Sequence, residues 1–554
     1  MKNQSNTFLS QIVFFLYMCG FYFNVEAQMP IPTLVKDINP GGQSSPSFLV
    51  NKEDTLYFAA GNDSYYGLWK SDGTEQGTQL VKGSSSGSDI WDFNNIVPAG
   101  NLVFFMIRDE LGDQHLWVSD GSNQGTIKVS PDSIDHIWSM RGFDGYLYFD
   151  AWDPTHGSEI WRSDGTPGGT MIVADINPGT ANSDPTGFVL YKNEIYFSAN
   201  NDGNGWNLWK TDGTETGTIK IKEINPSTSD NFLTGPFLVV DSLLFFIARG
   251  HNQGAELWRS NGTDAGTYMV KDVSPGIGDG TLGPLVEMEG IIYFAGMDVY
   301  GAELWRSDGT ASGTYLVKDV NPGLANGFLG AMHVAGNTLY FLGDDGVHGE
   351  ELWKTDGTII GTKLIKDINN SPYSSEIYGV ANIGDILFLS ANDYVHGQEI
   401  YKSDGTTQGT ELLYDFNPGT MPFNPGEFTV IKNQLFFTGY DGSLGFQLYK
   451  LDWSSMVSIE DELENWAVNH QFHFYPNPAT ERINLEANWE VNHSYQVSLL
   501  DMTGKTIYSE KISPMIGLSN YSIQLPDLVQ GYYLMTILED SQLVGREKVW
   551  IMGR

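Results

Sequence analysis

Cysteine is almost absent from this sequence of 554 residues, since Cys19 is the only one. It lies inside an N-terminal apolar run that we expect to be removed, so the mature chain owes nothing to disulfide bonds. A secreted chain without disulfides must rely on the size of its hydrophobic core.

Basic residues are scarce as well, with 30 Lys and Arg against 68 Asp and Glu, a formal net charge of −38. A surface this negative repels phosphate backbones and anionic lipid heads, which makes nucleic acid an unfavourable partner. Solubility is one interpretation of the charge, and binding of cations is the alternative.

A run of apolar residues from Phe8 to Phe23 is too short and too early in the chain for a membrane span. With one preceding Lys and small residues at Val25 and Ala27, it predicts a secretory signal peptide over residues 1–27, cleaved after Ala27. Lipidation at Cys19 is the alternative, but Met18 is not the small residue that such a signal places before the cysteine. The mature chain is expected to have no transmembrane segment.

Most of the chain repeats one unit of about 48 residues. An aromatic residue in its third strand recurs at spacings of 44 to 49 residues. The nine occurrences are Trp69, Trp117, Trp161, Trp209, Trp258, Trp305, Trp353, Tyr401 and Tyr449. So regular a period indicates one supersecondary unit per copy, and each copy contains four short candidate strands.

The strands carry bulky residues on both faces, as in "LYFAA" at 56–60, which indicates that each small sheet is covered on both sides. Four-stranded sheets of this length stacked face to face are the blades of a β-propeller, predicted here over residues 28–452. We expect nine blades, with eight as the alternative because the second unit is short and poorly matched. The chain opens with a lone fourth strand at 33–42 and its last unit stops after a third strand at 446–452, so the first should close the last blade.

The string "SDGT", followed two residues later by "GT", joins the third and fourth strands. Its Asp can accept backbone hydrogen bonds in an Asx-turn and its Gly supplies a positive φ. A metal-ligand role is the alternative, but Asn261 replaces the Asp in one copy and keeps only the turn chemistry. The predicted structural turn residues are Asp72, Asp164, Asp212, Asp308, Asp356 and Asp404.

The loops after strands two and four should share the opposite rim. They carry Asx-Pro-Gly strings and varied polar residues. Three interpretations of these residues remain: they form turns, they bind a hard cation such as Ca²⁺, or they bind a glycan or protein ligand. Two further residues stand out on first strands, where other units carry mostly apolar residues. The ligand-binding candidates are His156, Asp298, Tyr300, His348, His396, Arg141 and His333. No catalytic residue, metal site or cofactor is predicted, with Ca²⁺ as the open alternative.

After Trp453 the composition changes. Residues 453–471 are predicted to form an acidic linker with one candidate short helix. Residues 472–554 contain at least six alternating candidate strands, which favours a small Ig-like β-sandwich.

Two resemblances follow from these motifs. The repeated "ELWRSDGT" resembles the ELWxxDGT repeat family of secreted bacterial proteins, which implies a propeller-like repeat protein without implying an activity. The tail, with "YPNPATERINL", "DMTGK" and "LVQGYYLMTI", resembles the type A sorting domain of type IX secretion cargo. The motif residues are Tyr475, Pro476, Asn477, Pro478, Gly504, Gly531 and Tyr533. That resemblance implies export by the type IX machinery through the periplasm, then removal of the tail, with the body released or tethered to surface glycolipid.

Near-equal repeats supply many similar sites, which suits multivalent binding better than chemistry at one constellation. The sequence therefore favours a non-enzymatic binding or adhesion protein, secreted or at the cell surface, that presents loops to a glycan or protein ligand. An extracellular carbohydrate-active hydrolase or lyase, with its site on the rim or channel of the propeller, is the alternative.

Overall fold

The computed structural model describes residues 29–62, 65–83, 92–108, 113–201, 205–224 and 233–454. Of the C-terminal region it describes 473–475, 482–489, 494–500, 506–512, 517–525, 528, 531–539 and 542–551. The predicted signal peptide, and all but the first two residues of the linker at 453–471, lie outside these residues. Two compact units divide at residues 453 and 454. Within the described residues, no helix is long and apolar enough to span a membrane.

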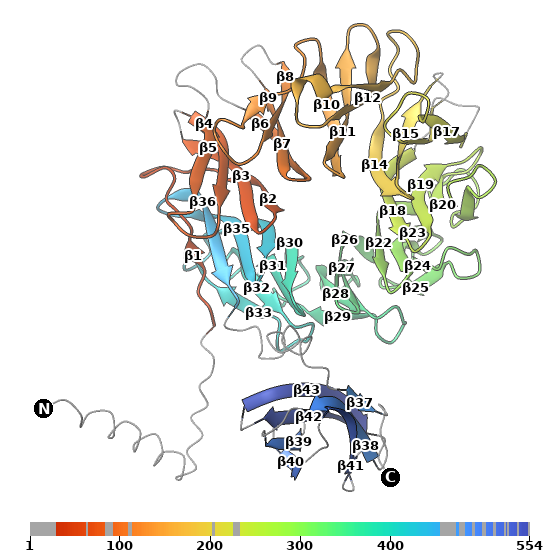
Figure 1. The fold of residues 1–554 in the computed structure, drawn as a ribbon. Helices are drawn as coiled ribbons and strands as arrows, with labels where there is room; N and C mark the ends of the chain where they lie inside the picture. Colours follow the sequence, from red (N-terminus) through yellow and green to blue (C-terminus); the bar gives the residue numbers. More distant parts are fainter. Residues whose placement is uncertain are drawn as a thin grey trace, which may run out of the picture. The chain divides into compact units, whose positions relative to one another are not determined.

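The described part of the first unit contains nine four-stranded antiparallel sheets (Figure 1). Eight are formed by consecutive strands. The first four of these are β2–β5 (Ser47–Lys52, Thr55–Asn62, Tyr65–Ser71, Gln79–Gly83), β6–β9 (Asp92–Ala99, Leu102–Arg108, Gln114–Ser119, Ile127–Lys128), β10–β13 (Asp135–Phe143, Tyr146–Asp153, Gly157–Ser163, Met171–Ala174) and β14–β17 (Thr186–Tyr191, Glu194–Asn200, Trp206–Thr211, Ile219–Lys222).

The next four are β18–β21 (Leu233–Val240, Leu243–Arg249, Ala255–Ser260, Tyr268–Lys271), β22–β25 (Thr281–Met288, Ile291–Asp298, Gly301–Ser307, Tyr315–Lys318), β26–β29 (Phe328–Ala335, Thr338–Asp344, Glu350–Thr355, Lys363–Lys366) and β30–β33 (Tyr378–Ile383, Ile386–Asn392, Gln398–Ser403, Glu411–Tyr414). The poorly matched second unit is thus a sheet of its own, β6–β9. A 3₁₀ turn, η1 (Pro167–Gly169), precedes β13.

The last sheet joins the two ends of the repeat region. Its order is β1-β36-β35-β34, with β1 at Thr33–Leu34, β34 at Gly426–Ile431, β35 at Gln434–Asp441 and β36 at Gly445–Asp452. Thr33 pairs with Lys450 and Leu34 with Tyr449, and the Val35 amide donates to the Leu448 carbonyl at 3.0 Å. The N-terminal strand therefore closes the last sheet, as predicted.

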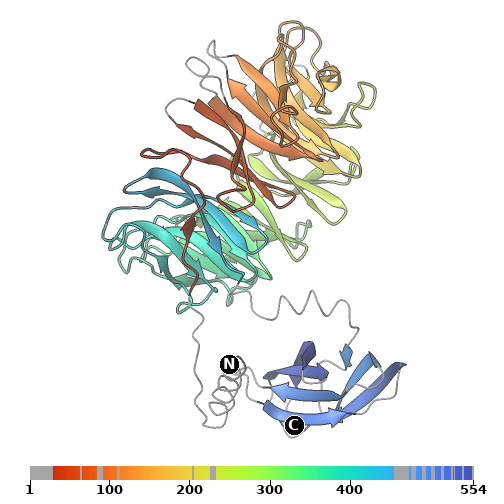
Figure 2. The same cartoon turned by 60° about the vertical axis from the view of Figure 1, so that its left-hand side comes forward.

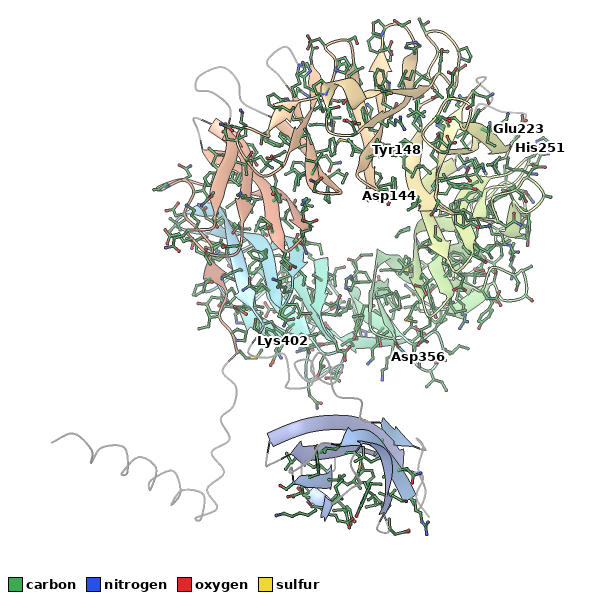
Figure 3. The ribbon with its side chains drawn as sticks, viewed as in Figure 1. Asp144, Tyr148, Glu223, His251, Asp356 and Lys402 are labelled. Carbon is green, nitrogen blue, oxygen red and sulfur yellow. The ribbon has the colours of Figure 1, made fainter. Side chains whose placement is uncertain are left out.

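The sheets form a ring in which first strands lie innermost. Each first strand contacts the first strand of the next sheet, from β2 to β6 and onward to β34, and β34 contacts β2. Turned by 60°, the same sheets lie face against face around the ring (Figure 2). Asp356 and Lys402 lie at its outer edge, and Tyr148 of a second strand lies nearer the centre (Figure 3). The fold is a β-propeller.

The core lies between neighbouring sheets, because second strands bury side chains on both faces. Tyr57 and Phe58 are adjacent in β3, yet both are buried in different clusters. Phe58 packs with Trp69, Val35 and Phe436 in a cluster that joins the first sheet to the last. Ring closure therefore uses the same kind of apolar contact as the other junctions.

Basic side chains also connect neighbouring sheets. The ammonium groups of Lys271 and Lys318, at the ends of fourth strands, donate to Thr carbonyls of the next sheet at 2.7 and 2.8 Å. Lys36, which follows β1, donates to the Thr78 carbonyl of the first sheet at 2.9 Å. This hydrogen bond repeats across the closing junction.

The C-terminal unit contains seven described strands in two sheets. One is β37-β38-β41 (His473–Tyr475, Arg482–Trp489, Gly517–Gln524), and the other is β40-β39-β42-β43 (Thr506–Ile512, Tyr495–Leu500, Gly531–Glu539, Gln542–Ile551). Its core includes Ile483, Val497 and Met535, all fully buried. Tyr475, Gly531 and Tyr533 lie on these strands, whereas residues 476–478 and 504 are outside the described residues.

Candidate functional site

The repeated "SDGT" turns hold their own side chains in local hydrogen bonds. In the turn from Ser307, Asp308 Oδ1 accepts from the Thr310 amide at 2.9 Å and from the Thr310 hydroxyl at 2.7 Å. The hydrogen bond from the Thr310 hydroxyl has the largest effect on the pKa of Asp308. Together with the bond from the amide, it holds that pKa below its ordinary value. The same two bonds are made at Asp72, Asp164, Asp212, Asp356 and Asp404.

The glycine of each of these turns lies against the preceding sheet. Gly309 has φ +81°, and a Cβ there would lie 2.9 Å from the Phe245 ring. Its carbonyl accepts from Arg259 of the same preceding sheet at 2.9 Å. Gly73 stands in the same way against Phe436 of the last sheet. This rim is therefore used for contacts between sheets.

On the opposite rim, the three histidines are held by aspartates of their own loops. His156 Nδ1 lies 2.7 Å from Asp153 Oδ2, and that carboxylate also accepts the His156 amide. His348 and His396 make the same contact with Asp345 and Asp393 at 2.8 and 2.7 Å. The hydrogen bond to the aspartate carboxylate raises the pKa of His156 and of His348. One ring nitrogen of each histidine is thus occupied within the loop.

The remaining candidates do not gather with these histidines. Asp298 accepts the Tyr300 amide at 2.8 Å, and the Tyr300 side chain is half-exposed. Arg141 is exposed on β10, opposite Tyr148. His333 Nε2 contacts Asn382 Oδ1 at 2.8 Å, beside a cavity of about 180 Å³ between β26–β27 and β30. The predicted residues belong to several sheets and form no single site.

Behind this rim, a buried glutamate recurs two residues before the third-strand aromatic. Its carboxylate accepts backbone amides of the loop after strand four, as Glu303 does from Val320 at 2.9 Å and from Gly327 at 2.9 Å. Burial raises the pKa of Glu159, Glu256, Glu303 and Glu351 to about 7 and that of Glu399 to about 8. Among the described residues, no group of three or more His, Cys, Asp or Glu is arranged to hold a metal ion.

This rim also carries an exposed apolar surface that was not predicted from the sequence, here called the apolar arc. The loops that form it touch one another: a Cβ on Gly301 would meet Leu324 and Ala325, and one on Gly346 would meet Asn321. Ile277 and Leu324 are each 85% exposed. The members of the arc are Ile277, Val299, Tyr300, Leu324, Val347, Tyr373, Tyr394, Val395 and Met421.

A sequence signal for the arc was present. Aliphatic residues stand inside strings that otherwise hold turn formers, as in "SPGIGDG" and "NPGLANG". The segments 272–280, 297–303, 319–327, 344–350, 367–376, 392–398 and 415–423 also contain several acidic residues and no Lys or Arg. The arc therefore combines apolar tips with negative charge.

Comparison with known proteins adds one assignment. Residues 473–552 match the family described as a secretion system C-terminal sorting domain. A search of curated proteins found no match. The tail thus supports export to the cell surface or the medium, and the type IX sorting domain expected from its motifs.

Solved structures similar to the chain are distant. A puromycin hydrolase is 12% identical, with 65% of this chain and 61% of that chain covered and a TM-score of 0.35. A puromycin-hydrolysing peptidase of Mycobacterium tuberculosis is 13% identical, with coverage of 63% and 57% and a TM-score of 0.35. A protein of Listeria monocytogenes is 10% identical, with coverage of 60% and 97% and a TM-score of 0.33. The match spans about three fifths of the two hydrolases, and TM-scores this low support no statement about activity.

Proposed function

We propose that this chain is a non-enzymatic binding or adhesion protein that type IX secretion exports to the cell surface or the medium. The β-propeller is the scaffold, and the rim with the apolar arc presents loops to an extracellular ligand. The sorting tail supports the export step. The repeated, near-equal loops support binding through many weak contacts.

The apolar arc is the observation that carries the binding role. Soluble proteins rarely expose many large apolar side chains on adjoining loops, and such surfaces mark interaction sites. The loops of the arc contain acidic residues and no Lys or Arg, and Arg249 at the end of β19 pairs with only one of these, Asp279, at 2.7 Å. The charge around the arc therefore complements a basic partner. Of the two ligand classes, these features favour an extracellular protein with basic and apolar side chains.

Replacement of the arc tests the binding role. We expect the triple variant Ile277→Ser, Leu324→Ser, Val347→Ser to lower retention of the purified propeller on the extracellular material of the producing cells by about tenfold. The matched control is the double variant Ile359→Ser, Ile360→Ser, because these side chains are also exposed but lie in a turn on the opposite rim. Equal retention of the arc variant and the wild type, at equal melting temperatures, would refute the role.

Removal of residues 472–554 tests export separately. The propeller should still fold, because its core does not include the tail. We expect the truncated protein to stay inside the cells while the full chain reaches the surface or the medium, measured by immunoblotting of cell fractions. Normal export of the truncated protein would contradict the sorting role without affecting the binding role.

A further inference from the structure

One sheet of the propeller carries a constellation that no other described sheet repeats. Trp138 of β10 pairs with Asp150 of β11, so their side chains share a face of the sheet. Trp152 lies two residues along β11, on the same face. Trp138 is 54% exposed and Trp152 is 38% exposed, whereas Asp150 is only 6% exposed. Two accessible indoles therefore accompany one buried carboxyl.

The fold does not require these side chains. Four other sheets pair their first and second strands in the same register. At the position of Trp138 and Asp150, each of them has a pair of uncharged residues. These pairs are Ser47 with Ala59, Thr186 with Ser198, Tyr378 with Ser390 and Gly426 with Thr438. Other sheets place a Ser, Thr or Ala at the position of Asp150. A buried carboxyl at that position lowers the stability of the fold relative to such a residue. Its presence in one sheet alone points to a role beyond packing.

The buried carboxyl of Asp150 uses only part of its hydrogen-bonding capacity. Ser158 Oγ donates to Asp150 Oδ1 at 2.5 Å, and this is the one hydrogen bond of Asp150 among the described residues. Burial, with the nearby Asp184 and Glu159 carboxylates adding to it, raises the pKa of Asp150 to about 8. At neutral pH the group is therefore mostly a neutral acid that can both donate and accept.

Two other carboxylates near the tryptophans are already hydrogen-bonded to protein groups. Asp153 is held by His156, and Asp135 accepts the Gln114 and His136 amides at 3.0 and 2.7 Å. The ligand that fits this face has a flat apolar side for the indoles and hydroxyl groups for a neutral carboxyl. A pyranose ring has both.

We propose that Trp138, Asp150 and Trp152 form a binding site for a neutral carbohydrate, with the sugar ring packed on the indoles and a hydroxyl hydrogen-bonded to Asp150. The site lies on β10 and β11, whereas the apolar arc lies on loops between Ile277 and Met421. It therefore does not depend on the partner proposed for the arc.

Isothermal titration calorimetry of the mature protein with neutral oligosaccharides tests this site. The probes are laminarihexaose, cellohexaose, mannohexaose and chitohexaose. We expect at least one to bind, and Trp138→Ala and Trp152→Ala each to weaken that binding by about tenfold. Ile360→Ala truncates a still more exposed apolar side chain, in a turn on the opposite rim, and should leave that binding unchanged.

Asp150 is tested with a matched pair of variants. Asp150→Asn keeps the shape and the ability to donate and accept, so we expect it to retain binding, whereas Asp150→Ala should lose it. Melting temperatures show whether each variant is folded. No binding of any probe, or binding unaffected by both tryptophan variants, would overturn the proposal. Binding of tetramethylammonium in place of the sugars would also overturn it, because the indoles would then hold a cation.

Discussion

At the residue scale, the aspartate of each "SDGT" turn acts through its shape and its acceptor oxygen. Asn261 occupies this place in one turn, and its Oδ1 accepts from the Thr263 amide at 3.1 Å and from the Thr263 hydroxyl at 2.7 Å. The amide oxygen makes the contacts that the carboxylate makes elsewhere. The negative charge is therefore not required for the turn.

Asp308→Ala should lower the free energy of unfolding by about 1 kcal/mol or less, because two exposed hydrogen bonds are lost. Asp308→Asn is the control and should be nearly neutral, as the natural turn at Asn261 indicates. Thermal or urea unfolding measures both variants. If Asn destabilises as much as Ala, the carboxylate charge matters and the turn account is wrong.

At the scale of elements, the same turns pack against the preceding sheet. A Cβ on Gly309 meets the Phe245 ring, whereas a Cβ on Gly41, which has a similar φ of +89°, meets nothing within 4 Å. Strain from the positive φ is common to both positions. The contact between sheets is present only at Gly309.

Gly309→Ala should therefore destabilise the protein more than Gly41→Ala. We expect about 1 kcal/mol from the backbone at each site, and about 1–3 kcal/mol more at Gly309 from displacement of the neighbouring sheet. The difference between the melting temperatures of the Gly309→Ala and Gly41→Ala proteins measures the contribution of the contact between sheets. Equal shifts would mean that the turns do not hold the sheets together.

The buried glutamates make the sheets sensitive to pH. Their folded-state pKa values of about 7 to 8 lie above the ordinary value of 4.5. The folded protein therefore binds more protons than the unfolded chain between these limits. The stability that they contribute is fully present below about pH 4.5 and is lost as pH rises through 7 to 8.

Replacement of these five glutamates by Gln should flatten stability between pH 5 and 8, where the wild type should lose stability. The chain already holds neutral amides at this position: Asn207 Oδ1 accepts the Ile224 amide at 3.0 Å, and Gln447 is fully buried. Urea unfolding at several pH values measures the slope. An unchanged slope in the variant would show that other groups titrate in this range.

At the scale of the whole molecule, one short strand joins the two ends of the repeat region. β1 has only two residues in the ladder, but Val35 and Ile38 beyond it are buried in the cluster that connects the first and last sheets. Lys36 adds the hydrogen bond seen at other junctions. Closure therefore rests on buried side chains as well as on strand pairing.

Val35→Asp should open this junction, because an unpaired carboxylate cannot be buried there without a large cost. We expect a lower melting temperature and self-association through the exposed edge of β36, measured by light scattering. Ile31→Asp is the matched control, since Ile31 is exposed. A monomeric Val35→Asp protein with an unchanged melting temperature would argue against closure by this strand.

The repeat, the strands and the closing of the ring could all be predicted from the amino-acid sequence. Bulky residues on both faces of each strand and the turn strings are local patterns, which depend on neighbours within a few residues. The lone fourth strand at 33–42 and the missing fourth strand after 446–452 follow from the period of the repeat. For the same reason, the tail motifs were sufficient to predict a sorting domain that the family comparison supports.

Which side chains contact one another could not be predicted from the sequence. His156, His348 and His396 looked alike as free rim residues, but each is bound to an aspartate three residues earlier through a loop geometry that composition does not encode. Trp138 reaches the face of Asp150 because β10 is irregular before it, with a register shift between Asp135 and Trp138 and a positive φ at His136. Such a bulge shifts the face of every following side chain, so alternation in the sequence does not predict that face.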